Sequence, residues 1–284
     1  MASTICGFSP NRQELWRYDG TPNAWTEIAP RADTDNLRVD RIYGGGSGLF
    51  GTAVNSPGFE QGSLTRWLAR GLGASHNHWT SIGGPGAKFV VTEKELFGLT
   101  PGHEAVWRYN DGFGGGGSGI GNWDQVGGAA ADLFGGYYGL FATSPDSGDI
   151  FRFLQGEWLR IGAPGASFVA TAESIYGLGD AGNVWRYDGT GDTWTQVGGP
   201  ASELYAGVWG LVATNPSDHQ LYRYLGQPFQ WEPIGGPGAV FAVTHDTVFG
   251  LTPDKSAVYR YDGAPNAWTV VGGPADEICA FQEH

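Results

Sequence analysis

The sequence predicts an all-β protein, a seven-bladed β-propeller made of four-stranded blades. Three observations lead to this prediction. The 284 residues include 49 glycines and 12 tryptophans, a composition that favours a single all-β domain. Units ending at Pro164, Pro200, Pro237 and Pro274 follow one another at intervals of 36 or 37 residues, which leaves room for four strands of about five residues and their turns. Within each unit, four short apolar runs alternate with turn residues, as in a propeller blade.

The stretch Phe168–Pro200 is the clearest copy of the unit. In its third run, Trp185, Arg186 and Tyr187 follow one another, and the strand period of two sends both rings to one face and the guanidinium to the other. Both faces of the sheet must therefore be covered, as they are when blades stack on blades. The four runs are Phe168–Ala170, Ser174–Leu178, Val184–Tyr187 and Thr193–Val197.

Two residue types occur once in every unit, an arginine in the third strand and a tryptophan in the fourth. Seven copies of each predict seven blades. The arginines are Arg17, Arg66, Arg108, Arg152, Arg186, Arg223 and Arg260. The tryptophans are Trp25, Trp79, Trp123, Trp158, Trp194, Trp231 and Trp268. The predicted blades are residues 4–30 together with 275–281, then 31–85, 86–129, 130–164, 165–200, 201–237 and 238–274, in one domain of residues 1–284.

The two ends of the chain share one blade in this prediction. The first unit begins at Thr4–Phe8, which matches a second strand and has no first strand before it. After the last unit, Asp276–Ala280 matches a first strand. We therefore expect the C-terminal strand to become the inner strand of the N-terminal blade, because this closes the ring and removes its free edge.

The only two cysteines, Cys6 and Cys279, fall on the two strands that close the ring. In a complete unit, Val169 and Tyr176 lie symmetrically about the turn between strands one and two, which makes them cross-strand partners in a simple hairpin. The same alignment puts Cys279 opposite Cys6. The pair is either two buried thiols or a disulfide that staples the ring, and the sequence leaves both open.

The units alternate between two types. Those of Arg66, Arg152 and Arg223 carry Gly-Leu followed by Phe or Val in the second strand, whereas those of Arg108 and Arg186, and the last unit, carry Phe or Tyr followed by Gly-Leu. Two units are also extended. The second blade gains residues 31–38, 55–62 and 69–78; the first two segments lie on one face of a propeller and predict a raised rim there. The third blade gains the glycine-rich segment 112–121, which predicts a flexible hairpin tip on the other face.

The arginine and tryptophan set is the strongest chemical signal. In a structural interpretation, each guanidinium caps backbone carbonyls between two blades and each indole fills the wedge between sheets, since no carboxylate recurs in step with the arginines. In a functional interpretation, the set forms equivalent sugar pockets, because an arginine hydrogen-bonds vicinal hydroxyls and an indole face takes the C–H face of a pyranose. The two interpretations can coexist.

The repeated text Tyr-Gly-Leu, Val-Trp-Arg-Tyr-Asp-Gly and Trp-Thr-Gln-Val-Gly, seen from Tyr176 to Gly198, resembles that of tectonin and tachylectin-type propeller lectins. The pairing of Arg and Trp is similar to that of fungal fucose-binding propeller lectins. This resemblance implies carbohydrate binding at repeated sites. A second resemblance is to kelch repeats, in which Tyr-Asp precedes a Trp as in Tyr18, Asp19 and Trp25, but the double glycines here follow the Trp rather than strand two.

Other polar groups predict little chemistry. Asp19-Gly20, Asp188-Gly189 and Asp262-Gly263 are typical tight-turn dipeptides. His76 and His78 have no third ligand nearby, so we expect a polar loop and no metal site. No catalytic motif, phosphate loop or cofactor signature is found.

The charge and hydropathy of the chain exclude two classes of partner. A net charge of −13 argues against nucleic acid, whose binders cluster Lys and Arg. No apolar segment is long enough to span a membrane, and the N-terminus lacks an export leader. We expect a soluble protein, cytoplasmic or exported by a route that needs no leader.

The sequence therefore predicts a non-enzymatic lectin whose candidate ligand-binding residues are the seven Arg and seven Trp, with glycans as partners. Several weak sites on one rigid ring would raise avidity for a glycan-coated surface. The alternatives are a kelch-like protein-interaction scaffold that uses the rim of the second blade, and an enzyme with a site in the central channel.

Overall fold

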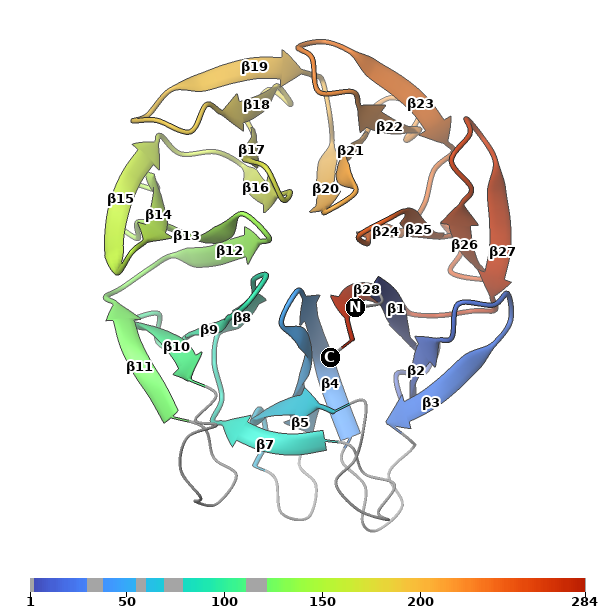
Figure 1. Ribbon diagram of the computed structural model, residues 1–284, viewed down its shortest axis with the longest axis horizontal. Helices are drawn as coiled ribbons and strands as arrows, with labels where there is room; N and C mark the ends of the chain where they lie inside the picture. The colour runs from blue at the N-terminus through green and yellow to red at the C-terminus, as the bar shows by residue number, and fades with distance from the viewer. Residues whose placement is uncertain (1–2, 30–37, 55–59, 69–78, 111–121, 284) are drawn as a thin grey trace.

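The computed structural model describes residues 3–29, 38–54, 60–68, 79–110 and 122–283, and over these it is a seven-bladed β-propeller. Seven antiparallel sheets, each of four strands, surround a central channel (Figure 1). This confirms the predicted fold class. The extended segments of the second and third blades lie largely outside the described residues, as do His76 and His78.

Each blade runs from an inner strand at the channel to an outer strand at the rim. Blade 1 is β28 (Glu277–Gln282), β1 (Ser3–Phe8), β2 (Leu15–Tyr18) and β3 (Trp25–Ala29). Blade 2 is β4 (Arg38–Gly45), β5 (Gly48–Val54), β6 (Leu64–Trp67) and β7 (Trp79–Gly83). Blade 3 is β8 (Lys88–Val91), β9 (Leu96–Leu99), β10 (Val106–Asn110) and β11 (Asn122–Gly127). Blade 4 is β12 (Asp132–Gly136), β13 (Gly139–Thr143), β14 (Ile150–Leu154) and β15 (Glu157–Gly162).

The last three blades follow the same order. Blade 5 is β16 (Ser167–Ala170), β17 (Ile175–Leu178), β18 (Val184–Tyr187) and β19 (Trp194–Gly198). Blade 6 is β20 (Glu203–Gly207), β21 (Gly210–Thr214), β22 (Leu221–Tyr224) and β23 (Trp231–Gly235). Blade 7 is β24 (Val240–Val243), β25 (Val248–Leu251), β26 (Val258–Tyr261) and β27 (Trp268–Gly272).

The alternation of unit types has a packing reason at the channel. The inner strands of blades 2, 4 and 6 end in glycine, where they press against the inner strand of the next blade. A Cβ at Gly45 would lie 2.6 Å from Val91 O, and one at Gly207 would lie 2.3 Å from Val243 O. A side chain cannot fit at these separations, so glycine is required where the inner strand of each of these blades meets the backbone of the next inner strand.

The ring closes as the sequence predicts, because β28 pairs with β1 over six positions from Ser3↔Gln282 to Phe8↔Glu277. Strand β28 is the inner strand of this blade, at the channel, with β1 beside it (Figure 1). Ion pairs hold the start of β28: Lys255 Nζ lies 2.7 Å from Asp276 Oδ1, and Arg12 contacts both Asp276 and Glu277. The pKa of Asp276 is lowered by the hydrogen bond from Lys255 and then by that from Arg12. The closing blade thus carries a charged clasp beside its backbone ladder.

The described part of the chain contains no helix that is long and apolar enough to cross a membrane.

Candidate binding sites between the blades

The seven strand-four tryptophans lie between neighbouring blades. In each case the indole Nε1 donates a hydrogen bond to a backbone carbonyl of the preceding blade, so the one N–H of the ring is already used. The distances are 2.8 Å for Trp25 to Val271, Trp79 to Ile28, Trp123 to Ile82, Trp158 to Val126 and Trp268 to Ile234, 2.6 Å for Trp194 to Ile161, and 2.9 Å for Trp231 to Val197. Only the ring surface of these residues remains for a ligand.

A β-bulge supplies the acceptor for each indole. In blade 5, Val184 pairs with Gly198 and Trp185 pairs with Gln196, so Val197 is the extra residue and its carbonyl is free of the ladder. The same register shift occurs between strands three and four of all seven blades. In six blades the residue after the bulge is a glycine, with Ala29 in blade 1, and in blade 5 it makes room for the ring, because a Cβ at Gly198 would lie 2.4 Å from Trp231 Nε1. The indoles therefore bind blade to blade.

The strand-three arginines face the next blade instead. Three of them pair with an aspartate two residues later in the chain. Arg17 Nη2 lies 2.6 Å from Asp19, Arg260 Nη2 lies 3.1 Å from Asp262, and Arg186 Nη2 lies 3.8 Å from Asp188. The expectation that no carboxylate recurs with the arginines is therefore wrong. The strand period of two places residues i and i+2 on the same face, so an Asp that begins a turn also reaches the guanidinium.

The aspartates of these turns make a second contact, with a strand-four threonine. Asp19 accepts from Thr26 at 2.8 Å, and Asp262 accepts from Thr269. In blade 5, Asp188 accepts from Thr195 at 3.0 Å. The pKa of Asp262 is lowered by the Thr269 hydrogen bond first and by Arg260 second. The Asp-Gly turns are thus also structural anchors for the arginines.

In blades 4 and 6 a leucine replaces the aspartate, and the arginine stacks on an aromatic ring. The Arg152 guanidinium carbon lies 4.0 Å from the centroid of the Tyr138 ring, and that of Arg223 lies 4.0 Å from the Trp209 ring. Both rings come from the turn between strands one and two. Arg152 Nη2 also donates to Tyr138 O at 3.2 Å, a carbonyl of its own blade.

The two remaining arginines of the set follow neither pattern closely. Arg108 lies 3.5 Å from both Glu95 and Asp124, and the Arg66 guanidinium carbon lies 5.8 Å from the Phe50 ring centroid. The prediction that every guanidinium caps carbonyls between blades is wrong, because carboxylates and aromatic rings take that place.

Four pockets occur at equivalent blade junctions. Their volumes are about 290 Å³ at blades 7 and 1, 130 Å³ at blades 2 and 3, 340 Å³ at blades 3 and 4, and 220 Å³ at blades 5 and 6. Each is lined by the half-buried aromatic residue before the strand-three arginine, the strand-four tryptophan and the glycine-rich exit of the preceding blade. The aromatic pairs are Trp16 with Trp25, Trp107 with Trp123, Phe151 with Trp158, and Tyr222 with Trp231.

Each pocket also has a polar residue where the loop between strands two and three begins. These residues are Ser9, Thr100, Ser144 and Asn215. None of the seven arginines is among the described residues that line the four pockets. The sheet separates the arginine from the strand-four tryptophan of its blade. In blade 1, Trp25 pairs with Tyr18 and therefore lies on the face opposite Arg17.

Sequence reasoning missed the residue before each arginine as a pocket residue. It is aromatic in six of the seven blades: Trp16, Trp107, Phe151, Trp185, Tyr222 and Tyr259, with Thr65 in blade 2. This recurrence was a readable signal, because a half-buried ring on the face opposite the arginine had to meet the preceding blade.

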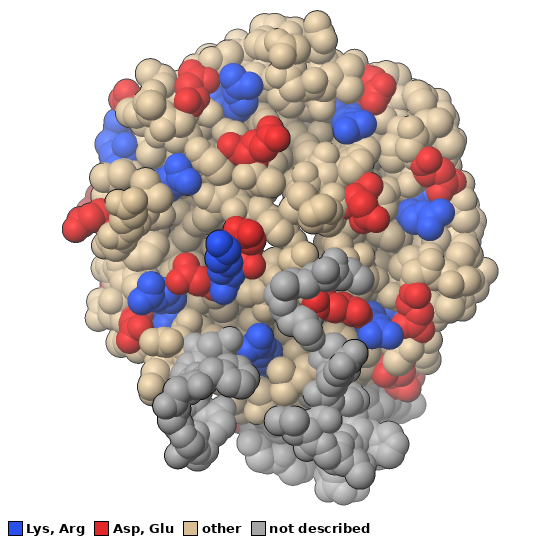
Figure 2. Space-filling view, viewed as in Figure 1, with Lys and Arg blue, Asp and Glu red and all other residues tan. Residues whose placement is uncertain are grey.

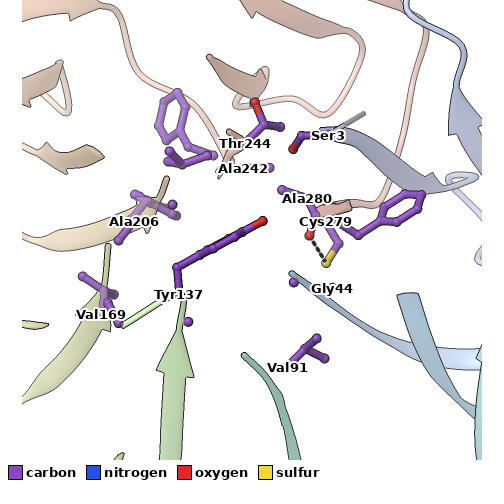
Figure 3. A pocket seen from close by; sticks show the side chains of 18 of the residues that line it. Ser3, Gly44, Val91, Tyr137, Val169, Ala206, Ala242, Thr244, Cys279 and Ala280 are labelled. Atoms are coloured by element: carbon purple, nitrogen blue, oxygen red, sulfur yellow. Dashed lines mark hydrogen bonds between the residues drawn. The ribbon is translucent and has the colours of Figure 1, made fainter. Parts of the chain in front are cut away.

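The central channel holds a further cavity of about 320 Å³. Tyr137 reaches into it from the turn of blade 4, and Ser3, Thr244 and Cys279 lie around it (Figure 3). Burial raises the pKa of Tyr137, and Glu93 adds to that effect. The described lining carries hydroxyl and thiol groups among glycine and apolar side chains, and no Asp, Glu, His, Lys or Arg.

Charges on the visible face are mixed. Most basic side chains in Figure 2 lie next to acidic ones. Arg160 shows this pattern, with Asp149 at 2.9 Å and Asp192 at 3.1 Å. Basic side chains paired in this way do not form the basic patch that a polyanionic partner requires.

No family model matches the chain, and no curated protein matches its sequence. Among solved structures, Prp20p from Saccharomyces cerevisiae, which binds Gsp1p and histones, is 10% identical with a TM-score of 0.58 over 95% of this chain and 86% of its own. Apo AztD from Citrobacter koseri is 11% identical with a TM-score of 0.55 over 98% and 96%.

The ectodomain of the receptor kinase CR4 from Physcomitrella patens is also similar. It is 16% identical with a TM-score of 0.48, and this chain covers only 61% of its length while the match takes in 84% of this chain. At such identities the likeness of Prp20p and AztD shows a shared propeller fold alone.

Proposed function

We propose that this protein is a carbohydrate-binding protein with several roughly equivalent sugar pockets at its blade junctions. The observation that carries the proposal is the recurrence of one pocket, built from the same structural positions, at four junctions. Equivalent pockets suit repeated recognition of one ligand type, whereas catalysis calls for a single distinct constellation. Several weak sites on one rigid ring would raise avidity for a glycan-coated surface.

The chemistry of the pocket walls supports a sugar as ligand. Half-buried aromatic rings offer apolar surface to the C–H face of a pyranose. Trp231 keeps its Nε1 on Val197 O, so its ring is fixed in place before a ligand arrives. Asn215 and the backbone of the exit Gly199–Ala201 offer polar groups to hydroxyls. The volumes lie near or below the ~300 Å³ lower bound of drug-sized ligand pockets, which favours one sugar ring over a long oligosaccharide.

The proposal gives the arginines and tryptophans different roles. Trp25, Trp123, Trp158 and Trp231 line pockets and hold blades together. The arginines support the blade junctions through ion pairs such as Arg17 with Asp19 and stacking such as Arg223 on Trp209. Loss of an arginine should therefore act on stability rather than on the sugar.

A protein-interaction scaffold is a second candidate. It is supported by two exposed apolar residues in the loop between strands three and four of blade 6, Leu225 at 47% exposure and Phe229 at 65%. Neither residue lines the pocket at this junction, so the two functions can be tested separately. The rim of the second blade, which the kelch-like alternative would use, lies largely outside the described residues.

The test is a glycan array followed by titration calorimetry with a sugar that binds. We expect more than one site per chain, with Trp107→Ala and Tyr222→Ala each removing one site and the double variant removing both. Phe229→Ala is the matched control, because it deletes an exposed ring that does not line the pocket and keeps the backbone N–H that donates to Val197 O. Binding to no glycan, a single site, or loss of sugar binding in the control would overturn the proposal.

A further inference from the structure

The ring closure contains a pair of thiols in direct opposition. In the antiparallel pairing of β1 with β28, Cys6 stands opposite Cys279. Directly opposed residues share one face of the sheet, with Cβ atoms about 4.5–5.5 Å apart. Both cysteines are free thiols in this structure, and Cys6 Sγ lies 3.7 Å from Cys279 O. This is the one blade whose two inner strands are not joined by a turn.

The two thiols differ in their access to solvent. Cys6 is fully buried among Phe8, Leu15 and Phe281, whereas Cys279 is half-buried and lines the central cavity (Figure 3). Burial raises the pKa of Cys6 well above its usual value, and the hydrogen bond and charge of Cys279 add to the effect. Cys6 is therefore a poor first nucleophile, and Cys279 is the thiol that a small reagent can reach.

The neighbouring blade packs closely against the half-buried thiol and has a glycine at the contact. A Cβ at Gly44 would lie 2.8 Å from Cys279 Sγ and 2.2 Å from Ala280 O. Any other residue at position 44 would press on the sulfur or on the backbone that carries it. The cavity of about 320 Å³ in front of Cys279 opens along the channel, so a small molecule can approach the thiol from that side.

We propose that Cys6 and Cys279 form an oxidation site that takes a low-molecular-weight disulfide, such as glutathione disulfide, and converts the closed ring into a covalently closed one. The Cys279 thiolate attacks one sulfur of the small disulfide, forms a mixed disulfide and releases one small thiol. Cys6 then attacks Cys279 Sγ and expels the second small thiol, which takes up the proton that Cys6 loses. Two protein thiols and one small disulfide thus become one protein disulfide and two small thiols.

The covalent bond would act where only non-covalent contacts now hold the blade. The clasp formed by Arg12, Lys255 and Asp276 lies before the start of β28 and is independent of the thiols. A cross-link from Cys6 to Cys279 closes nearly the whole chain into one loop, the case in which the chain-entropy model gives the largest stabilisation. The oxidised protein should melt roughly 5–15 °C above the reduced one.

The experiment incubates the folded protein in glutathione buffers of graded redox potential, then alkylates it under denaturing conditions and measures mass and melting temperature. Wild type should lose both alkylatable thiols without retaining glutathione. Cys6→Ala should stop at a mixed disulfide on Cys279, and Cys279→Ser should stay unmodified because its one remaining thiol is buried. Cys6→Ser repeats the first variant in case alanine impairs folding.

Three results would overturn the proposal. One is wild-type protein that keeps both thiols across the redox range. Another is Cys279→Ser reacting as fast as Cys6→Ala, since this would contradict the assigned order of attack. The third is an internal disulfide that leaves the melting temperature unchanged.

Discussion

The bulge carbonyls that accept the indole N–H groups allow a sharp test of what holds the blades together. Ile161 O accepts Trp194 Nε1 at 2.6 Å, and Val197 O accepts Trp231 Nε1 at 2.9 Å. Val197 O also accepts the backbone N–H of Phe229 at 2.8 Å, whereas no loop N–H in the described chain does this for Ile161 O. The two carbonyls therefore differ in what remains when the indole N–H is removed.

Trp194→Phe should cost more stability than Trp231→Phe. Both changes remove a similar part of a half-buried ring, for about 1–2 kcal/mol. Only the first leaves a buried carbonyl without a partner, because Ile161 is 2% exposed, and that adds about 1–2 kcal/mol. The expected totals are about 2–4 kcal/mol for Trp194→Phe and about 1–2 kcal/mol for Trp231→Phe.

Urea unfolding followed by circular dichroism measures the difference. Shifts in the midpoint at constant slope report stability directly. Equal losses in the two variants would refute the reasoning, because the surviving N–H donor would then have no energetic value. A greater loss in Trp231→Phe would show that ring packing, rather than the bulge carbonyl, dominates these junctions.

Three further predictions follow from the same structure. Asp276 has a lowered pKa in the folded state, so its contribution to stability is fully present above its unfolded pKa of about 3.9 and is lost as pH falls through the folded pKa. Asp276→Asn should therefore cost about 1–2 kcal/mol of stability near neutral pH and flatten the pH dependence of the melting temperature below about pH 4. A pH profile identical to that of wild type would contradict the clasp. Arg152→Ala should cost about 1–2 kcal/mol of stability, because its stacking on Tyr138 and its hydrogen bond to a carbonyl are lost. Arg186→Ala should cost less than about 1 kcal/mol, because it removes only a part-exposed ion pair at 3.8 Å. Melting followed by calorimetry ranks the two variants, and the reverse order would refute the roles given to these two arginines. Gly207→Ala should lower stability by about 1–3 kcal/mol, because its Cβ would lie 2.3 Å from a carbonyl oxygen of the next blade. Gly236→Ala should have little effect, because no atom lies within 4 Å of the added Cβ. Equal melting temperatures for the two variants would mean that the inner strands can move apart.

The repeat itself determined the architecture. Seven copies of a four-run unit, with strand-period alternation in each, required blades whose two faces are covered. Thr4–Phe8 matches a second strand with no first strand before it, and Asp276–Ala280 matches a first strand with no second strand after it. This was enough to predict the closing strand, which is β28 in the structure. These features are local or periodic, so the chain order alone carries them.

Contacts between blades were decided only in the folded ring. The sequence grouped Arg186 with Trp194 because they recur together, but the sheet sends the guanidinium toward the next blade while the indole donates to Ile161 O of the preceding one. The bulge that frees this carbonyl is a register shift between two strands, and periodicity within one strand does not encode it. The pockets have the same origin, because Tyr222 and Trp231 of one blade meet Gly199 and Pro200 of another. Which residues of neighbouring blades face each other depends on how the sheets pack, and that is settled by tertiary structure.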